Sequence, residues 1–107
     1  MPDKIESLLG FAVRAGKILY GFDNIETMRK KRYLLIFDET ASERLARHVQ
    51  TYALSKKLPL LKVKHRKLED LVNKLNCKVV ALTDKQMSEA ILKFVNENYE
   101  VLTSEVK

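Results

Sequence analysis

The sequence predicts an α/β domain in which helices cover both faces of a sheet. Two short runs, YLLIF at 33–37 and KVVAL at 78–82, are too apolar to alternate with polar residues, Lys78 at the start of the second run excepted, as in strands that are buried on both faces. Segments with apolar residues at helical spacing alternate with such strands, which favours an α/β/α sandwich. The 107 residues are 46% hydrophobic and include only three glycines and two prolines. We therefore expect one domain over residues 1–107, with no linker or repeat.

The first half of the chain contains two helical patterns around a short extended segment. Apolar residues recur at helical spacing from 5 to 13, and Gly16 can end this helix. The segment ILY at 18–20 is expected to be a strand. A second helix would turn Ile25 and Met28 inward before YLLIF forms the first buried strand.

The second half repeats the alternation of helices and strands. A helix is expected after YLLIF, then the strand PLLKV at 59–63, another helix, the strand KVVAL and a last helix. The inward positions of the three helices are Leu45, Ala46, Val49, Tyr52 and Ala53, then Leu68, Leu71, Val72 and Leu75, then Met87, Ala90, Ile91, Phe94 and Val95.

Four pairs of side chains have the spacing of a capping box at a helix start. The pairs are Asp3 with Glu6, Asp23 with Glu26, Thr40 with Glu43, and Thr83 with Gln86. Paired carboxylates can also serve acid–base catalysis, but Asp23 and Glu26 are better explained as caps. Asp38 and Asp84 follow strand ends, where α/β enzymes place active groups, yet neither has a nucleophile beside it in the sequence.

Other signs of catalysis or cofactor binding are weak. Three isolated glycines make neither a dinucleotide fingerprint nor a phosphate-binding loop. His48 and His65 have no partner at zinc-ligand spacing, and Cys77 is expected to be an inert core thiol. We therefore expect no enzyme activity, no catalytic residue, no metal, no cofactor and no small-molecule substrate. The single cysteine, the absence of a signal-like start and the lack of a long apolar run favour a cytoplasmic protein without a membrane segment.

The charge is positive and unevenly distributed. The net charge is +6, and residues 1–83 carry 17 basic and 9 acidic side chains, whereas residues 84–107 carry 3 and 5. A small domain with such a field attracts polyanions, of which nucleic acid is the commonest inside cells. An anionic membrane surface would need an amphipathic basic helix with bulky apolar residues opposite, and the sequence does not contain one.

The basic residues form two clusters. The first is Arg29, Lys30, Lys31 and Arg32, and the second is Lys62, Lys64, His65, Arg66 and Lys67. The second cluster precedes a predicted helix, where cations are unfavourable because the helix dipole is already positive, so a bound phosphate would explain it. The first cluster is expected at the end of the second helix, where cations also complement the dipole, so binding and structural roles remain open.

Four stretches resemble the L-seven-Ae and L-thirty-e family of ribosomal proteins, with the bacterial YlxQ type as the nearest branch. The stretches are SLLGFAVRAGKILYG, NIETMRKKRYLLIFDETASE, LPLLKVKHRKLEDL and CKVVALTDKQMSEAIL, and the resemblance extends from about Ile5 to Phe94. It implies an L-thirty-e-like α/β/α sandwich with a small mixed sheet, and binding of kink-turns or related RNA loops without catalysis. The family's RNA surface corresponds to Gly21–Thr27, Asp38–Ala41 and Val63–Lys67. Kink-turn readers typically have Gly-x-Asn-Glu and then a Lys, where this chain has Gly21, Asp23, Asn24 and Thr27.

Our interpretation is a non-catalytic RNA-binding protein associated with the ribosome or translation. The expected partners are structured RNA and, in second place, ribosomal proteins, with Asn24 reading a base and Arg29–Arg32 flanking the RNA surface. The predicted RNA-binding residues are Gly21, Phe22, Asp23, Asn24, Thr27, Arg29, Lys30, Lys31, Arg32, Asp38, Glu39, Thr40, Lys62, Lys64, His65, Arg66 and Lys67. The alternatives are a protein-interaction module of the RNA machinery without specific RNA reading, and a small hydrolase that uses Asp38 or Asp84.

Overall fold

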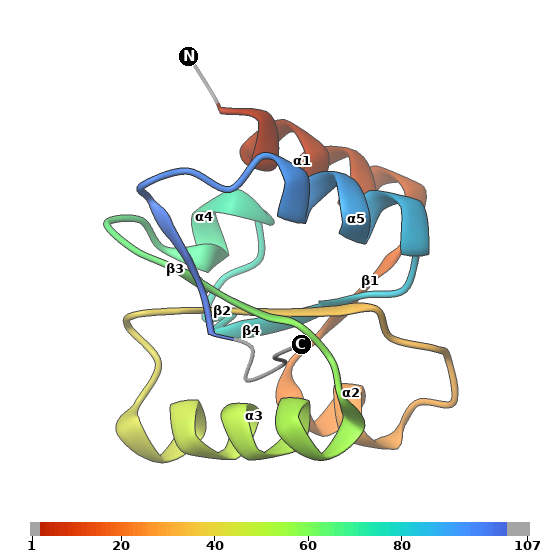
Figure 1. Cartoon of the computed structure of the whole chain (residues 1–107), viewed down its shortest axis with the longest axis vertical. Helices are drawn as coiled ribbons and strands as arrows, with labels where there is room; N and C mark the ends of the chain where they lie inside the picture. The colour runs from red at the N-terminus through yellow and green to blue at the C-terminus, as the bar shows by residue number, and fades with distance from the viewer. Residues whose placement is uncertain (1–2, 103–107) are drawn as a thin grey trace.

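The computed structural model describes residues 3–102, which form a five-stranded mixed sheet and five helices (Figure 1). In chain order the elements are α1 (Lys4–Ala15), β1 (Ile18–Tyr20), α2 (Phe22–Thr27), β2 (Leu34–Asp38), α3 (Glu43–Lys56), β3 (Leu60–Val63), α4 (Leu68–Leu71), β4 (Val79–Leu82), α5 (Lys85–Lys93) and β5 (Tyr99–Val101). The predicted α/β class is confirmed.

The sheet has the strand order β1-β4-β2-β3-β5. Only the pair β2 and β3 is parallel, and the other three pairs are antiparallel. All five residues of β2 are buried, and four of them, Leu34–Phe37, belong to the apolar run at 33–37 from which this strand was predicted, while the fifth is Asp38. The strand β5 was not predicted, because its three residues hold one buried tyrosine and two exposed positions instead of an apolar run.

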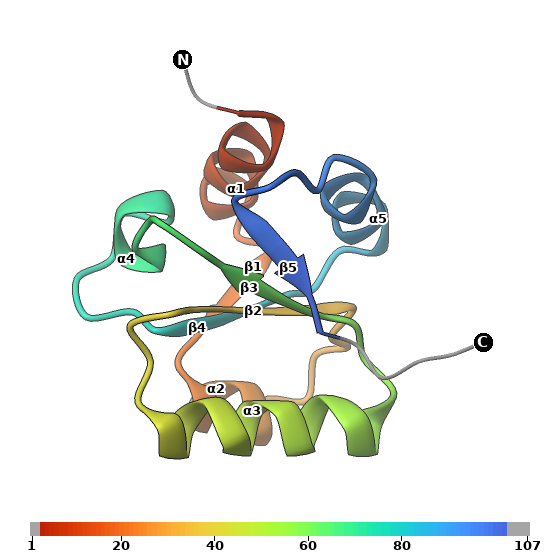
Figure 2. The same cartoon turned by 60° about the vertical axis from the view of Figure 1, so that its left-hand side comes forward.

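Helices cover both faces of the sheet. Figures 1 and 2 show α2 and α3 on one face and α1, α4 and α5 on the other. Successive side chains of β2 point to opposite faces, so Leu34 and Ile36 join the core beneath α1 and α5 while Leu35 and Phe37 join the core beneath α3. The longest helix, α3, has 14 residues, and no helix within residues 3–102 combines the length and apolarity needed to cross a membrane.

Three helices end earlier than the apolar pattern predicts. Helix α2 ends at Thr27, so Met28 is exposed instead of inward. Helix α4 ends at Leu71, and Leu75 is 80% exposed in the following loop. Phe94 also lies beyond the end of α5 and is exposed. In each case the periodic spacing continues past the point at which the backbone leaves the helix.

One of the four predicted caps is correct. Asp3 caps α1 by accepting the Glu6 N–H at 2.7 Å. Helix α2 begins at Gly21 without a side-chain cap, so the capping box predicted for Asp23 and Glu26 is wrong. The cap of α3 is Ser42, two residues after the predicted Thr40.

The cap of α5 is also displaced from its predicted position. Asp84 accepts the Met87 N–H at 2.9 Å, one residue after the predicted Thr83. The N–H of Thr83 donates to the Lys17 carbonyl at 3.0 Å. Thr83 is therefore still tied to the chain entering β1, and α5 begins after it, with Asp84 as its cap.

Candidate functional site

Three segments that are distant in the sequence meet at one edge of the sheet. Gly21, at the end of β1, donates its N–H to the Val79 carbonyl at 3.0 Å, and Asp38, at the end of β2, donates to Lys78 at 3.4 Å. The next residue, Glu39, donates to Val63 at the end of β3 at 3.1 Å. The predicted segments 21–27, 38–41 and 63–67 therefore all begin at this edge, which we call the site edge.

Gly21 adopts a backbone conformation that favours glycine. Its φ is +84°, and a Cβ built on it would have no heavy atom within 4 Å, so the conformation, and not lack of space, selects glycine. The open space continues into a hollow of about 260 Å³. Its lining residues are Tyr20, Gly21, Phe22, Leu45, Lys74, Leu75, Asn76, Cys77, Lys78 and Val79. The hollow thus lies between the start of α2 and the loop before β4.

The loop before β4 contributes residues that the sequence analysis did not include in the site. Lys74 Nζ lies 5.2 Å from the centre of the Tyr20 ring, and Lys78 Nζ donates to Thr40 Oγ1 at 2.9 Å. Leu75, which was predicted to be inward, projects into solvent beside them. Two asparagines in the sequence could have indicated that this segment is a loop. Asn73 and Asn76 both adopt positive φ and mark a turn on either side of Lys74 and Leu75.

The polar residues of α2 are exposed but partly engaged within their own helix. Asn24 Nδ2 donates to the Tyr20 carbonyl at 2.9 Å, and Thr27 Oγ1 donates to the Asp23 carbonyl at 2.8 Å. Among residues 3–102 the Asn24 amide oxygen has no hydrogen-bond partner. Phe22 is half-buried and packs edge-on against the Tyr52 ring, with 5.5 Å between centroids. Phe22 therefore fixes α2 on α3.

Asp38 is buried and has a structural role. It is 1% exposed, and its Oδ2 accepts the Leu68 N–H at 2.6 Å. Its Oδ1 accepts the Thr40 N–H at 3.0 Å and the Thr40 hydroxyl at 2.6 Å. The prediction that Asp38 contacts RNA is therefore wrong for its side chain, which instead caps α4 from the neighbouring strand. It also supplies the negative charge that we had expected a phosphate to bring to the start of α4.

The second basic cluster divides into bound and free side chains. Arg66 Nη2 pairs with Glu6 Oε1 at 2.6 Å and its Nη1 lies 3.9 Å from Asp3, so Arg66 ties the β3–α4 loop to α1 and is not a free phosphate ligand. The hydrogen bond and charge of Glu6 raise the pKa of Arg66 above its ordinary value. The His65 N–H donates to Glu39 Oε2 at 3.0 Å.

The lysines of this cluster differ in their surroundings. Lys62 lies within β3, directly opposite Glu100 of β5. Lys64 is half-buried and Lys67 is exposed, and neither forms an ion pair within the described part of the chain. Lys64 and Lys67 thus remain available at the site edge.

The first basic cluster does not flank the site edge. Residues 29–32 form the loop that leads into the start of β2, whereas the site edge is at its end (Figure 1). At the start of β2, the Tyr33 N–H donates to the Leu82 carbonyl at 2.9 Å. Arg32 donates to the carbonyls of Ile25 and Met28 and so caps the C-terminal end of α2. The predicted flanking position of this cluster is therefore wrong.

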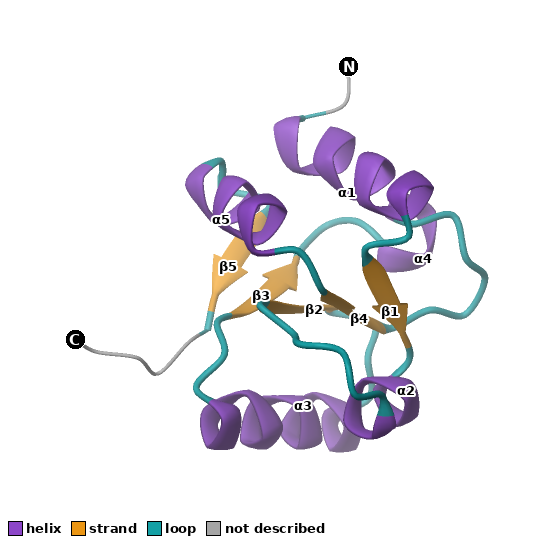
Figure 3. Cartoon of the chain, turned by 90° about the vertical axis from the view of Figure 1, so that its right-hand side faces the viewer, coloured by secondary structure: helices purple, strands orange, loops and turns teal. Residues whose placement is uncertain are grey.

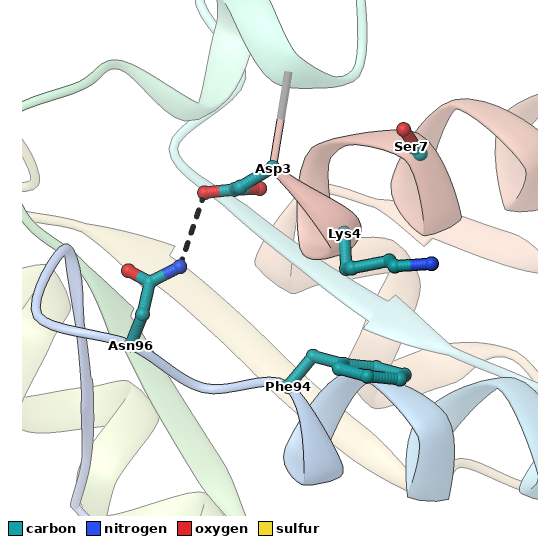
Figure 4. A pocket seen from close by; sticks show the side chains of 5 residues that line it. All are labelled: Asp3, Lys4, Ser7, Phe94 and Asn96. Atoms are coloured by element: carbon teal, nitrogen blue, oxygen red, sulfur yellow. Dashed lines mark hydrogen bonds between the residues drawn. The ribbon is translucent and has the colours of Figure 1, made fainter. Parts of the chain in front are cut away.

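A second hollow, of about 510 Å³, lies between the start of α1 and the end of α5 (Figure 4). Asp3 accepts a hydrogen bond from Asn96 at 3.4 Å, and Lys4 Nζ lies 5.6 Å from the centre of the Phe94 ring. Burial tends to raise the pKa of Asp3, but its hydrogen bonds and the Arg66 charge hold it below the ordinary value. The polar groups that line this hollow bind one another, and these contacts connect α1 to the chain leading into β5.

The comparisons with known proteins identify the fold alone. No protein-family model and no curated protein matches the chain. A solved structure from Bacillus halodurans, described as a protein with unknown function, is similar with a TM-score of 0.75 and 22% sequence identity. The alignment covers 87% of this chain and 97% of that chain.

Proposed function

We propose that the chain is a non-catalytic RNA-binding domain with an L-thirty-e-like sandwich, acting in the cytoplasm on structured RNA of the translation machinery. The observation that carries the proposal is the meeting of the segments 21–27, 38–41 and 63–67 at the site edge. These are the segments that the family resemblance assigns to RNA, and β1, β2 and β3 bring their first residues together.

The site edge offers the two kinds of contact that structured RNA requires. Lys64, Lys67 and Lys74 present ammonium groups that can neutralise phosphates without reading sequence. Beside Gly21, the hollow with the exposed Leu75 can accept an unstacked base, because looped-out bases are what proteins read in RNA. The Asn24 amide oxygen can accept a hydrogen bond from a base edge.

Salt dependence tests the phosphate contacts. We expect the double variant Lys67→Gln, Lys74→Gln to bind a structured RNA more weakly and with a shallower dependence of log affinity on log salt. Each lost contact should change the slope by about 0.7 to 0.9. The matched control is Lys4→Gln, Lys93→Gln, which removes the same charge from the layer of α1 and α5. Equal salt-dependence slopes for the two variants would show that Lys67 and Lys74 do not contact the RNA.

Base reading is tested separately with Asn24→Ala. We expect this variant to lose about 1 to 3 kcal/mol of preference for a kink-turn over a plain duplex, with duplex affinity nearly unchanged. Asp23→Asn should strengthen binding, since it removes an exposed negative charge from the RNA side of α2. The control is Gln50→Ala on the exposed surface of α3. Gel-shift titrations at one fixed salt concentration measure all three variants.

A protein-interaction module without specific RNA reading is the alternative. It predicts that the unmodified protein binds kink-turn and duplex equally, and that Asn24→Ala alters neither affinity. If the unmodified protein shows no salt-dependent binding to any RNA, RNA binding is refuted altogether. The exposed Leu75 would then be a candidate protein contact.

A further inference from the structure

The edge of the sheet opposite the site edge carries its own concentration of positive charge. The loop 28–33 enters β2 there, and α3 ends beside it (Figure 3). Lys31 and Lys56 line one hollow of about 230 Å³ together with Arg32, Tyr33, Tyr52 and Leu58. We call Arg29, Lys30, Lys31, Lys56 and Lys57 the far patch. All five are exposed, and none forms an ion pair within the described residues.

Helix capping does not account for the far patch. The carbonyls of Ile25 and Met28 at the end of α2 are already bound by Arg32. At the end of α3 the backbone N–H of Lys57 binds the carbonyls of Ala53 and Leu54. The side chains of the far patch are therefore not needed to satisfy these helix ends.

The far patch also lacks neighbouring negative charge in the sequence. No Asp or Glu occurs from Thr27 to Phe37, and none occurs from Arg44 to Leu68. Each of the two stretches thus carries cations and no negative charge of its own, and the acidic residue at this end of the sheet, Asp84, comes from the end of β4. A stability-driven surface would intersperse both signs, because clustered like charges repel one another.

We propose that the far patch binds the phosphate backbone of a second RNA segment, so that one molecule holds two segments at opposite ends of its sheet. Strand β2 separates the two edges by five residues, or about 17 Å of extended chain. The two sets of cations lie at opposite ends of this strand, so each set can contact a different RNA segment. We expect binding at the far patch to be independent of the RNA sequence, because lysines contact phosphate as point charges.

The experiment measures bridging between two short RNA duplexes, one with a donor dye and one with an acceptor dye. Energy transfer should rise with added protein and then fall when protein exceeds RNA. In Lys30→Gln, Lys31→Gln this signal should be lost, and it should persist in the control Lys4→Gln, Lys93→Gln. Both double variants remove two lysines, so a difference between them reports position and not net charge.

Salt titration of single-duplex binding provides the second measurement. Loss of two contacts should reduce the slope by about 1.4 to 1.8. Between about 50 and 200 mM salt, the affinity of the unmodified protein should then fall about 7- to 12-fold more than that of the variant. An unchanged slope and unchanged bridging in Lys30→Gln, Lys31→Gln would overturn the proposal.

The same titrations separate this inference from the proposed function. If Lys67→Gln, Lys74→Gln weakens binding while Lys30→Gln, Lys31→Gln behaves like the control, the site edge binds RNA and the far-patch proposal fails. If the far-patch variant alone weakens binding, the proposed site edge fails and phosphate binding by the far patch is supported. No binding of any RNA by the unmodified protein would refute both.

Discussion

The replacement Asp38→Asn tests whether the buried carboxylate holds the site edge together. An Asn at this position can still accept the two bonds from Thr40 through its oxygen, but its amide group then faces the Leu68 N–H, which is also a donor. The variant therefore loses one buried bond to a charged acceptor and leaves one donor unpaired. Hydrogen bonds to charged groups contribute about 1.5 to 3 kcal/mol, so we expect a loss of stability of this size.

Urea unfolding followed by circular dichroism measures the loss. With a denaturant dependence of about 1 to 3 kcal/mol per molar, a destabilisation near 2 kcal/mol lowers the midpoint by about 1 M. Glu89→Gln, which removes the same charge from an exposed position on α5, should stay within about 0.5 kcal/mol of the unmodified protein. Hydrogen exchange should also accelerate at the Leu68 amide in Asp38→Asn. Stability equal to that of the control, with unchanged exchange at Leu68, would refute the assigned role.

Three further predictions concern stability and reactivity. Ser42→Ala should cost about 1 kcal/mol in urea unfolding, since Ser42 caps α3, and no loss would show that the cap does not contribute. Burial, followed by the charge of Asp3, raises the pKa of Tyr99. The stabilisation that the neutral Tyr99 side chain contributes is therefore complete below about pH 10 and is lost as the pH rises further. Tyr99→Phe should therefore lose less stability with alkaline pH than the unmodified protein, and parallel pH profiles would contradict this. Burial also raises the pKa of Cys77, so a thiol reagent should label it far more slowly in the native than in the unfolded protein, and equal rates would contradict its buried position.

The strands of the core were predictable because burial on both faces leaves a direct record in the sequence. A run such as YLLIF cannot alternate with polar residues, and the structure places β2 at the centre of the sheet. Short edge strands leave no such record, and β5 was missed for that reason. Helix ends were less predictable because apolar spacing does not report where the backbone changes direction. Leu75 continues the spacing of α4, but the helix has already ended at Leu71.

Contacts between distant residues explain the errors within the candidate site. Thr40, two residues after Asp38, has the spacing of a helix cap, but its hydroxyl donates to the Asp38 carboxylate and Ser42 caps α3 instead. The bond from Leu68 to Asp38 and the ion pair between Arg66 and Glu6 join residues far apart in the chain. Charge type and local spacing could suggest that these residues were important. They could not show which charges are neutralised within the protein itself.

The pairing of β1 with β4 has a consequence for how the chain acquires its fold during synthesis. Ile18 in β1 pairs with Leu82 in β4, and β4 also pairs with β2, so it separates the first strand from the centre of the sheet. While a ribosome makes the chain from its N-terminus, β1 has no strand partner until residues 79–82 have left the exit tunnel. Such long-range pairing delays folding, because a large loop must close before its contacts form. At about 5 to 20 residues per second, the apolar segment of β1 waits several seconds in a nascent chain, during which chaperones can bind it.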